Sequence, residues 1–255
     1  AKKMKTKFAL AVTSGTSAIK IGLKALGVKP GDEVITQGFN FIATVEAIID
    51  TGAKPIMCNI DQSLNMCPHD LKKLISKKTK AIIPVHMLGV TCKMDEIKQI
   101  AKKNRIKILE DNCESMGGKY KNKLLGTLGE IGVVSYDFGK TITCGEGGMI
   151  FTNDKKLDKY VRDYHDHGHE LNPKFPRGED TVKIVGFNYR MTEMQAIVGK
   201  EQLKKLNKII RENKKRYKKL EKKIKNVASF REEPKKGEQI YDTLILFMKN
   251  KKKRN

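Results

Sequence analysis

The sequence predicts an α/β fold in which a mainly parallel mixed sheet is flanked by helices on both faces. Short β-prone runs alternate with amphipathic helical stretches along most of the chain, the pattern of repeated strand–helix units. Residues 81–86 form an apolar run of the kind that is buried on both faces of a parallel sheet. Because 39% of the 255 residues are hydrophobic, the chain can bury one sizeable core, with room for a small second domain.

The individual elements follow from residue periodicity and from residues that start or stop helices. Residues 17–26 show helical periodicity, and Gly27, shortly before Pro30, ends that helix. Pro68 suits the first turn of another helix. Further helices are expected over 44–50, 68–75 and 95–102, and strands over 34–35, 55–60, 81–86, 106–109, 132–135 and 149–152. Ligands of such folds bind at the carboxyl ends of the strands.

A long amphipathic helix is expected after this domain. Between Met191 and Ile224 apolar residues recur mostly at steps of three or four, with lysines between them. We expect a large α/β domain over 1–190, a connecting helix over 191–226, and the start of a small carboxyl-terminal domain over 227–255. The chain does not begin with methionine and has an abrupt, lysine-rich end, so the expectation is a fragment with a truncated small domain. In the small domain, 243–247 is an expected strand and 251–254 an expected disordered run.

The chain is strongly basic, with a formal net charge of +23 concentrated after residue 200. One interpretation is an electrostatic footprint for nucleic acid or another anionic surface. The other is a solvated helix face. We favour the solvated face because no interleaved aromatic residues and no known nucleic-acid motif accompany the charge.

The composition also predicts where the protein works. No run approaches the roughly 20 apolar residues of a membrane span, and the start lacks the apolar stretch of a signal peptide. The five cysteines are odd in number and the two closest are nine positions apart, which excludes a disulfide framework and a CxxC pair. These features predict a soluble, cytoplasmic protein with reduced thiols and no membrane partner.

Two nucleotide-binding motifs are excluded by position. A phosphate-binding loop that uses the Gly-Lys-Thr triplet at 139–141 needs another glycine at position 134, where Val134 stands. The glycines between 126 and 132 mimic dinucleotide-binding spacing, but a predicted strand rather than a helix follows them.

Three features place chemistry at the carboxyl ends of the predicted strands. Lys140 follows a strand in a glycine-rich loop, so its amine can be held as a nucleophile towards an aldehyde, although a surface lysine is the commoner alternative. Asp111 follows the strand that ends at Leu109; it either caps the next turn or pairs with the pyridinium nitrogen of pyridoxal phosphate. Residues 13–17, directly before a helix, form either an ordinary N-cap or a phosphate site.

A metal site is not expected. His165, His167 and His169 alternate along the chain, but Gly168 interrupts any regular strand and no further ligand cluster is visible. We expect this segment to lie at a helix end, where a protonated histidine is favourable.

Six motifs, in order along the chain, resemble the DegT/DnrJ/EryC1/StrS family of sugar aminotransferases. They are TSGT at 13–16, FNFIAT at 39–44, PVHMLG at 84–89, EDNCE at 110–114, SYDFGK at 135–140 with GEGG at 145–148, and GFNYR at 186–190. The resemblance implies the large domain of a fold-type-I pyridoxal-phosphate transferase. It also implies that an upstream segment and most of the small carboxyl-terminal domain are absent.

The resemblance implies roles around the cofactor ring. Lys140 would bind the cofactor covalently and later move a proton between substrate and cofactor carbons, and Asp111 would pair with the pyridinium nitrogen. Phe41 would lie against the ring face; without the resemblance it is equally a core phenylalanine. Glu114 stands where many members have glutamine, near the phenolic oxygen. A carboxylate there must share a proton or be offset by a nearby cation, so we predict an unusual proton arrangement.

The phosphate of the cofactor would bind at the other matched positions. The resemblance assigns this role to Gly15, Thr16 and Ser135. Asn188 would reach the phosphate of a neighbouring subunit, which implies a homodimer with shared active sites.

The implied activity is an amino transfer in two half-reactions. An amino acid, with glutamate the expected donor, gives its amine to the cofactor, which then aminates a keto or aldehyde carbon of a sugar in cell-surface polysaccharide or amino-sugar biosynthesis. The sugar is a nucleotide-linked ketosugar or, by the similarity of 164–169 and 186–191, an octulosonic acid. A family branch with histidine at the lysine position removes a hydroxyl instead, and Lys140 argues against it. The alternative is a catalytically inactive relative that binds nucleic acid through its basic helix.

Overall fold

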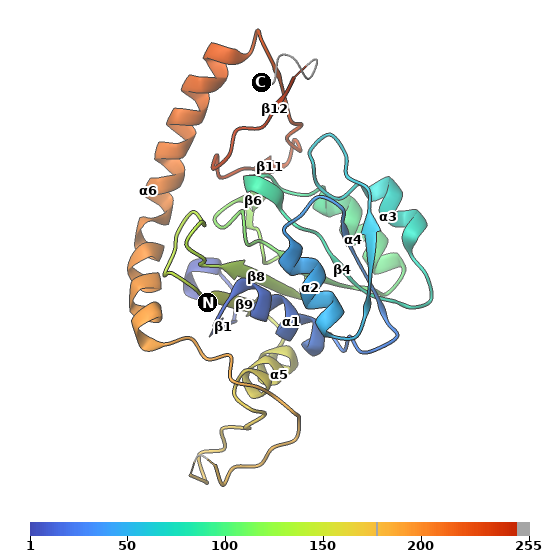
Figure 1. Cartoon of the computed structure of the whole chain (residues 1–255), viewed down its shortest axis with the longest axis vertical. Helices are drawn as coiled ribbons and strands as arrows, with labels where there is room; N and C mark the ends of the chain where they lie inside the picture. Colours follow the sequence, from blue (N-terminus) through green and yellow to red (C-terminus); the bar gives the residue numbers. More distant parts are fainter. Residues whose placement is uncertain (177, 249–255) are drawn as a thin grey trace.

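A computed structural model describes residues 1–176 and 178–248, and its centre is a seven-stranded sheet (Figure 1). The strand order is β1-β9-β8-β5-β4-β2-β3, and within this sheet β9 alone runs antiparallel to its neighbours. This confirms the predicted mainly parallel mixed sheet. The strands are β1 (Phe8–Val12), β2 (Glu33–Gln37), β3 (Lys54–Cys58), β4 (Thr79–Ile83), β5 (Lys107–Asp111), β8 (Ile131–Ser135) and β9 (Gly148–Thr152).

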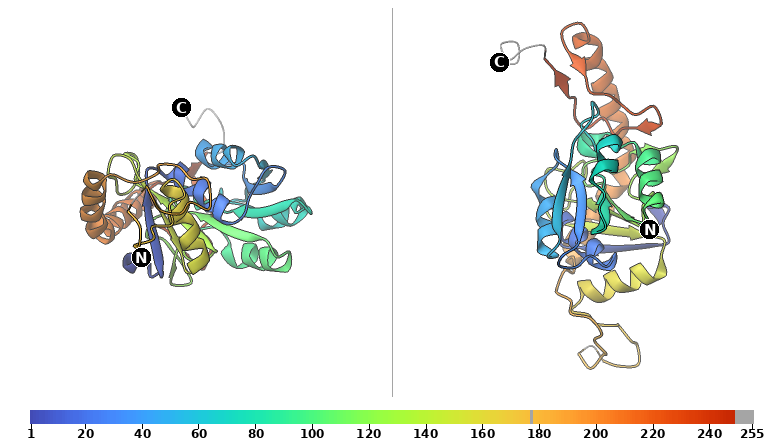
Figure 2. Two further views of the ribbon diagram at one scale, coloured as in Figure 1. Left: turned by 90° about the horizontal axis from the view of Figure 1, so that it is seen from below. Right: turned by 90° about the vertical axis from the view of Figure 1, so that its right-hand side faces the viewer.

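Helices cover both faces of the sheet (Figure 2). On the central strand β8, successive side chains point to opposite faces, so Val133 is buried in one apolar core and Val134 in another. The first face carries α1, α2 and α5, and the second carries α3, α4 and the first half of α6. The helices are α1 (Gly15–Ala25), α2 (Ile42–Asp50), α3 (Pro68–Leu74), α4 (Met94–Lys103), α5 (Lys155–His165) and α6 (Glu193–Ile224), with 3₁₀ turns η1 (Lys2–Met4) and η2 (Met87–Gly89).

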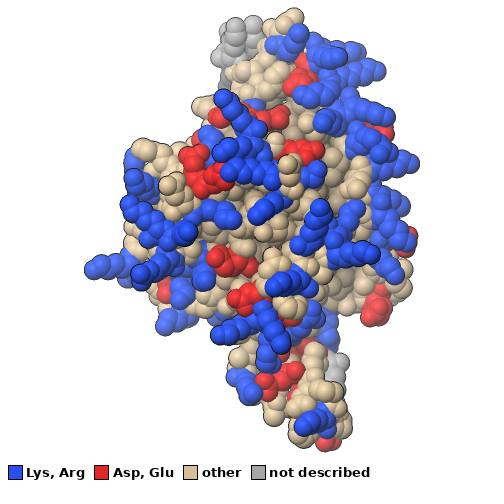
Figure 3. All heavy atoms as spheres, turned by 180° about the vertical axis from the view of Figure 1, so that it is seen from behind, with Lys and Arg blue, Asp and Glu red and all other residues tan. Residues whose placement is uncertain are grey.

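The long helix α6 runs along the outside of the sheet domain (Figure 1). It begins at a capping box, in which Thr192 Oγ1 accepts from Gln195 N at 3.3 Å and the Gln195 side chain accepts from Thr192 N at 3.1 Å. Its buried residues are Gly199, Leu206 and Tyr217, and its lysines line one edge of the molecule (Figure 3). Across 1–176 and 178–248, no helix, α6 included, is apolar enough over sufficient length to cross a membrane. The division into three domains stays a prediction.

Between α6 and residue 248, the chain forms only short ladders. They are β10 (Ser229–Phe230) with β12 (Leu246–Phe247), and β11 (Gly237–Glu238) with β6 (Lys119–Tyr120), which also pairs with β7 (Lys123–Leu124). The predicted strand over 243–247 is therefore too long. The chain just before it follows the 87–89 turn, where Ile240 N donates to Gly89 O at 3.1 Å instead of to a strand. The run 251–254 lies outside the described residues.

Further elements differ from the sequence prediction. Strand β1 was not predicted, and of helix α5 only an end near the histidines was. The strand expected over 81–86 lies at Thr79–Ile83, since Pro84 has no N–H to continue the ladder. The strand expected over 55–60 lies at Lys54–Cys58, because beyond Cys58 the Asn59 N–H donates to the Asp70 carboxylate at 2.8 Å rather than to a neighbouring strand.

Candidate active site

A cavity of about 480 Å³ lies at the carboxyl ends of the parallel strands. Its walls come from the loops after β1, β4, β5 and β8 and from the start of α2. The structure thus brings together segments from position 14 to position 146. Every predicted site residue except Asn188 lines this cavity, namely Gly15, Thr16, Phe41, Asp111, Glu114, Ser135 and Lys140.

Asp111 presents a buried carboxylate to the cavity. Asp111 is only 3% exposed to solvent. Oδ2 accepts from the Thr44 hydroxyl at 2.8 Å, and Oδ1 accepts from Cys113 N at 3.1 Å. Burial, reinforced by the Asp111 charge, raises the pKa of the Cys113 thiol well above its usual value. Because neutral donors satisfy the carboxylate without neutralising it, a cationic ring nitrogen entering the cavity would meet an unpaired negative charge.

Glu110, the neighbour of Asp111 on β5, points away from the cavity and anchors the strand. Its carboxylate accepts from the backbone N–H of Gly126 at 3.0 Å, of Leu128, and of Gly129 at 2.6 Å. His86 Nε2 lies 3.1 Å from the same carboxylate. The His86 Nδ1 atom accepts from a backbone N–H, that of Cys92, so the ring proton is on Nε2 and faces Glu110. Of the two carboxylates at this strand end, only Asp111 is available to a ligand.

The amine of Lys140 also faces this cavity. A tight turn fixes the backbone, since Lys140 N donates to Asp137 O at 3.1 Å. The Nζ atom lies 3.4 Å from Glu114 Oε1 and 5.7 Å from the centroid of the Phe41 ring. Phe41 is 62% exposed, so the interpretation as a core phenylalanine is wrong. The Lys140 ammonium group is therefore a nearby cation that can offset the negative charge of Glu114, one of the two arrangements expected from the sequence.

The amino end of α1 closes the cavity next to Ser135. Ser14 caps this helix by accepting from Ser17 N at 3.0 Å, and the N–H groups of the first turn have no intrahelical acceptor. Gly15 packs so closely that a Cβ atom there would lie 2.8 Å from Ser135 Cβ. Glycine therefore lets the helix end approach the Ser135 hydroxyl, which forms a cradle suited to a phosphate group.

Asn188 lies outside this cavity. It is exposed and pairs with Asp166 in an isolated antiparallel bridge, and its Oδ1 accepts from Arg190 N at 3.3 Å. The chain after α5 projects from the body in a loop (Figure 1) and then returns, so that Tyr189 O accepts from Thr13 N at 3.0 Å next to Asn188. A role for Asn188 in a neighbouring subunit stays a prediction.

The histidine segment follows the end of α5. His165 lies in the last helical turn, as predicted, but burial lowers its pKa, so the expected protonated form is disfavoured. Among the residues that the structure describes, no group of three His, Cys, Asp or Glu side chains is placed to hold a metal ion.

Thr44 is the site residue that sequence reasoning missed. It belongs to the FNFIAT motif, but no signal along the chain shows that its hydroxyl meets a carboxylate 67 positions away. The place of Thr44 in a motif shared with the family was the only indication that it belongs to the site.

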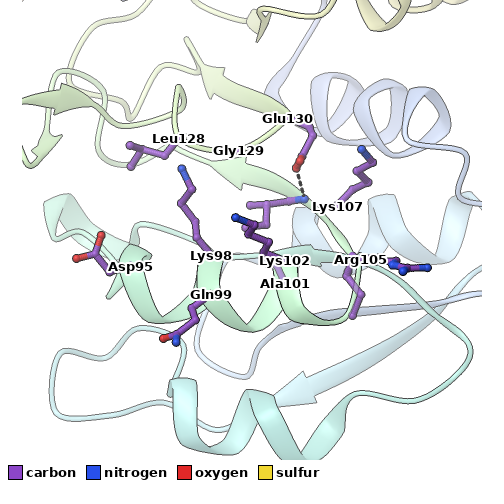
Figure 4. A pocket seen from close by; sticks show the side chains of 12 residues that line it. Asp95, Lys98, Gln99, Ala101, Lys102, Arg105, Lys107, Leu128, Gly129 and Glu130 are labelled. Carbon is purple, nitrogen blue, oxygen red and sulfur yellow. Dashed lines mark hydrogen bonds between the residues drawn. The ribbon is translucent and has the colours of Figure 1, made fainter.

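A second, larger cavity of about 600 Å³ lies at the opposite, amino edge of the sheet (Figure 4). It is formed by α4, the start of β5 and the loop before β8, and it contains none of the predicted site residues. The cationic side chains Lys98, Lys102, Arg105 and Lys107 on its walls are all exposed. Glu130 in this cavity accepts from a backbone N–H, that of Ile108, at 2.7 Å.

The fold is that of aminotransferases that depend on pyridoxal phosphate. The chain belongs to the DegT/DnrJ/EryC1/StrS aminotransferase family, whose model matches residues 1–255. It is 42% identical over 204 residues to GDP-perosamine synthase of Escherichia coli O157:H7, an alignment that covers 80% of this chain and 55% of that protein. The chain thus spans about half the length of the curated relatives it matches.

Solved structures show the same likeness. The aminotransferase from Psychrobacter cryohalolentis superimposes with a TM-score of 0.91 at 30% identity, covering 98% of this chain and 67% of that one. A mutant GDP-4-keto-6-deoxymannose-3-dehydratase with bound GDP-perosamine gives 0.90 at 31% identity, covering 98% and 70%.

Proposed function

We propose that this protein is a pyridoxal-phosphate-dependent aminotransferase that moves an amino group from an amino acid, with glutamate the expected donor, to a sugar ketone or aldehyde. One observation carries the proposal. The Lys140 amine, paired with Glu114, and the buried Asp111 carboxylate face one cavity from different strand ends. That pairing of amine and buried carboxylate is the one that binding and activating a pyridine aldehyde requires.

The residues present fit the cofactor. Asp111 would hold the ring nitrogen in its protonated form, Phe41 would cover the ring, and Lys140 would bind the aldehyde carbon. Gly15, Thr16 and Ser135 would bind the phosphate at the positive end of α1. When bound, the cofactor supplies an electron sink for bonds broken at the carbon that carries the amine.

Lys140 Nζ would carry out the proton transfers in both half-reactions. Glu114 Oε1, at 3.4 Å, lies where it can share the amine proton, and Leu88 N donates to the other oxygen of Glu114 at 3.1 Å. A proton can thus stay on the amine or pass to substrate, while Glu114 is held in place by the backbone.

The similar proteins favour a nucleotide-linked ketosugar over an octulosonic acid as the acceptor. One relative is a GDP-perosamine synthase, and one structural neighbour holds GDP-perosamine. We further propose a cytoplasmic homodimer, supported by the exposed position of Asn188 on the surface of the body.

The test is cofactor capture followed by transfer. The purified protein is mixed with pyridoxal phosphate, reduced with borohydride and digested; we expect the label on the peptide that contains Lys140. Glutamate is then supplied with nucleotide-linked ketosugars or octulosonic acid, and aminated sugar is measured. A colourless protein without labelled Lys140 would refute the proposal. Salt-sensitive retention of nucleic acid by such a protein would favour the inactive-relative alternative.

A further inference from the structure

A buried arginine in the carboxyl-terminal segment reaches the backbone beside the proposed active site. Arg231 is 4% exposed. Its Nε donates to Ser63 O at 2.9 Å, and its Nη1 donates to Met87 O at 2.9 Å and to Leu88 O at 3.5 Å. Burial lowers the pKa of this guanidinium. Backbone carbonyls receive all of these N–H groups, and a buried cation must keep such acceptors in place.

The turn that Arg231 contacts is strained. Leu88 has φ 50° and ψ 47°, the left-handed region that a residue with a Cβ atom adopts only at an energetic cost. Arg231 binds the carbonyls of Met87 and Leu88, and Ile240 N donates to the Gly89 carbonyl at 3.1 Å. Three successive carbonyls of the turn are therefore held by one short stretch of the chain.

The strained residue also holds the partner of Lys140. Leu88 N donates to Glu114 Oε2 at 3.1 Å, and Glu114 Oε1 faces Lys140 Nζ at 3.4 Å. Rotating Leu88 out of the left-handed region would turn this N–H away from Glu114. The conformation of Leu88 thus sets where the carboxylate lies.

We propose that Arg231 is a positioning residue of the active site. It keeps Leu88 left-handed, so that the Leu88 N–H fixes Glu114 against the Lys140 amine. The importance of this contact for catalysis rests on the proposed function, whereas the mechanical link from Arg231 to Glu114 does not.

The test compares Arg231→Met with Arg216→Met, which makes the same chemical change at an exposed position of α6. Hydrogen exchange is followed at the amides of Leu88 and of Leu109 in the core of β5. We expect Leu88 protection to fall at least about tenfold in Arg231→Met, the effect of losing about one hydrogen bond. Leu109 protection should stay unchanged, and Arg216→Met should alter neither amide.

The second readout is the reactivity of Lys140 towards an acylating reagent at pH 8 in cofactor-free protein. Glu114 Oε1 binds the amine at 3.4 Å, so a loosened Glu114 leaves the amine freer to react. We expect labelling of Lys140 in Arg231→Met to be about tenfold faster, the effect of losing about one hydrogen bond. Glycine adopts the left-handed region without strain, so adding Leu88→Gly to Arg231→Met should restore slow labelling.

Two results would overturn the inference. One is a folded Arg231→Met protein with normal protection at Leu88. The other is loss of Leu109 protection in both Arg231→Met and Arg231→Lys, which would make Arg231 a general structural residue. If both readouts respond but the protein captures no pyridoxal phosphate, the proposed function fails and the positioning link stands.

Discussion

The two cavities at opposite edges of the sheet differ in how their charged groups are held. At the amino edge, Lys102 and its neighbours are exposed around a larger space. At the carboxyl edge, Asp111 is buried, and Lys140 is held by a turn, a carboxylate and an aromatic ring. The difference teaches that constraint on side chains, rather than cavity size or net charge, distinguishes a chemical site from a basic surface.

The sharpest test of this comparison removes one lysine from each cavity. We expect Lys140→Ala to lower amino transfer by at least about 10²–10⁴-fold, because the nucleophile and the acid–base group are both lost. Lys102→Ala, at the amino edge, should leave transfer unchanged. Steady-state rates with glutamate and a ketosugar measure both, and denaturant unfolding checks that both variants fold. Equal losses in the two variants would contradict the comparison.

The next largest effect is expected at the buried carboxylate. Asp111→Asn should lower transfer by about 10²–10³-fold, because a preorganised charge facing the cofactor is removed. An amide can still accept from Cys113 N, and the Thr44 hydroxyl can rotate, so the free energy of unfolding should change by less than about 1 kcal/mol. Rate measurements and urea unfolding separate the two effects. A large loss of stability with normal transfer would assign Asp111 a structural role only.

The sequence was sufficient for the fold and for most of the cavity. Alternating strand and helix patterns predicted the sheet, and parallel strands bring their carboxyl ends to one edge. That is why Asp111 and Ser135, at the ends of β5 and β8, meet residues of the α1 start. The catalytic role of Lys140 could be predicted only through the resemblance to the family. Its loop alone does not distinguish it from the many surface lysines of this chain.

Contacts that depend on tertiary packing could not be predicted. Arg231 lies among charged residues in a basic, lysine-rich region, a composition that favours exposure, yet the fold buries it against backbone carbonyls. Thr44 meets Asp111 only because α2 packs over the strand ends. The role predicted for Asn188 needs a second chain, so it stays a prediction.

A smaller effect, on stability, is expected when either of two buried threonine hydroxyls is removed. Thr44 donates to the Asp111 carboxylate at 2.8 Å, whereas Thr51 donates to the neutral carbonyl of Ile48 at 2.7 Å. Hydrogen bonds to charged groups contribute about 1.5–3 kcal/mol and neutral ones about 0.5–1.5 kcal/mol. We therefore expect Thr44→Val to lower the free energy of unfolding more than Thr51→Val does, as measured in urea at pH 7. Equal losses would mean that the hydrogen bond to the Asp111 carboxylate contributes no more than the one to the Ile48 carbonyl.

The smallest effect is expected at Asp95 in the first turn of α4, whose carboxylate lies 2.7 Å from Lys121 Nζ and 2.8 Å from Lys236 Nζ. Hydrogen bonds from Lys121 and then Lys236 lower the pKa of Asp95 from 3.8 to about 2. A lowered folded-state pKa stabilises the protein above the ordinary value, and this contribution is lost as the pH falls from about 4 to 2.

Because Asp95 is 39% exposed at its side chain, solvent screens these pairs, and Asp95→Asn should cost only about 0.2–1 kcal/mol at pH 7. Urea unfolding at pH 7, 4 and 2 should show this difference shrinking with pH, and 1 M salt should reduce it. Glu96→Gln is the control, since Glu96 shares the first turn of α4 and hence the same helix-dipole interaction. A larger loss that persists at pH 2 would show that these exposed charges are held as firmly as those around Lys140.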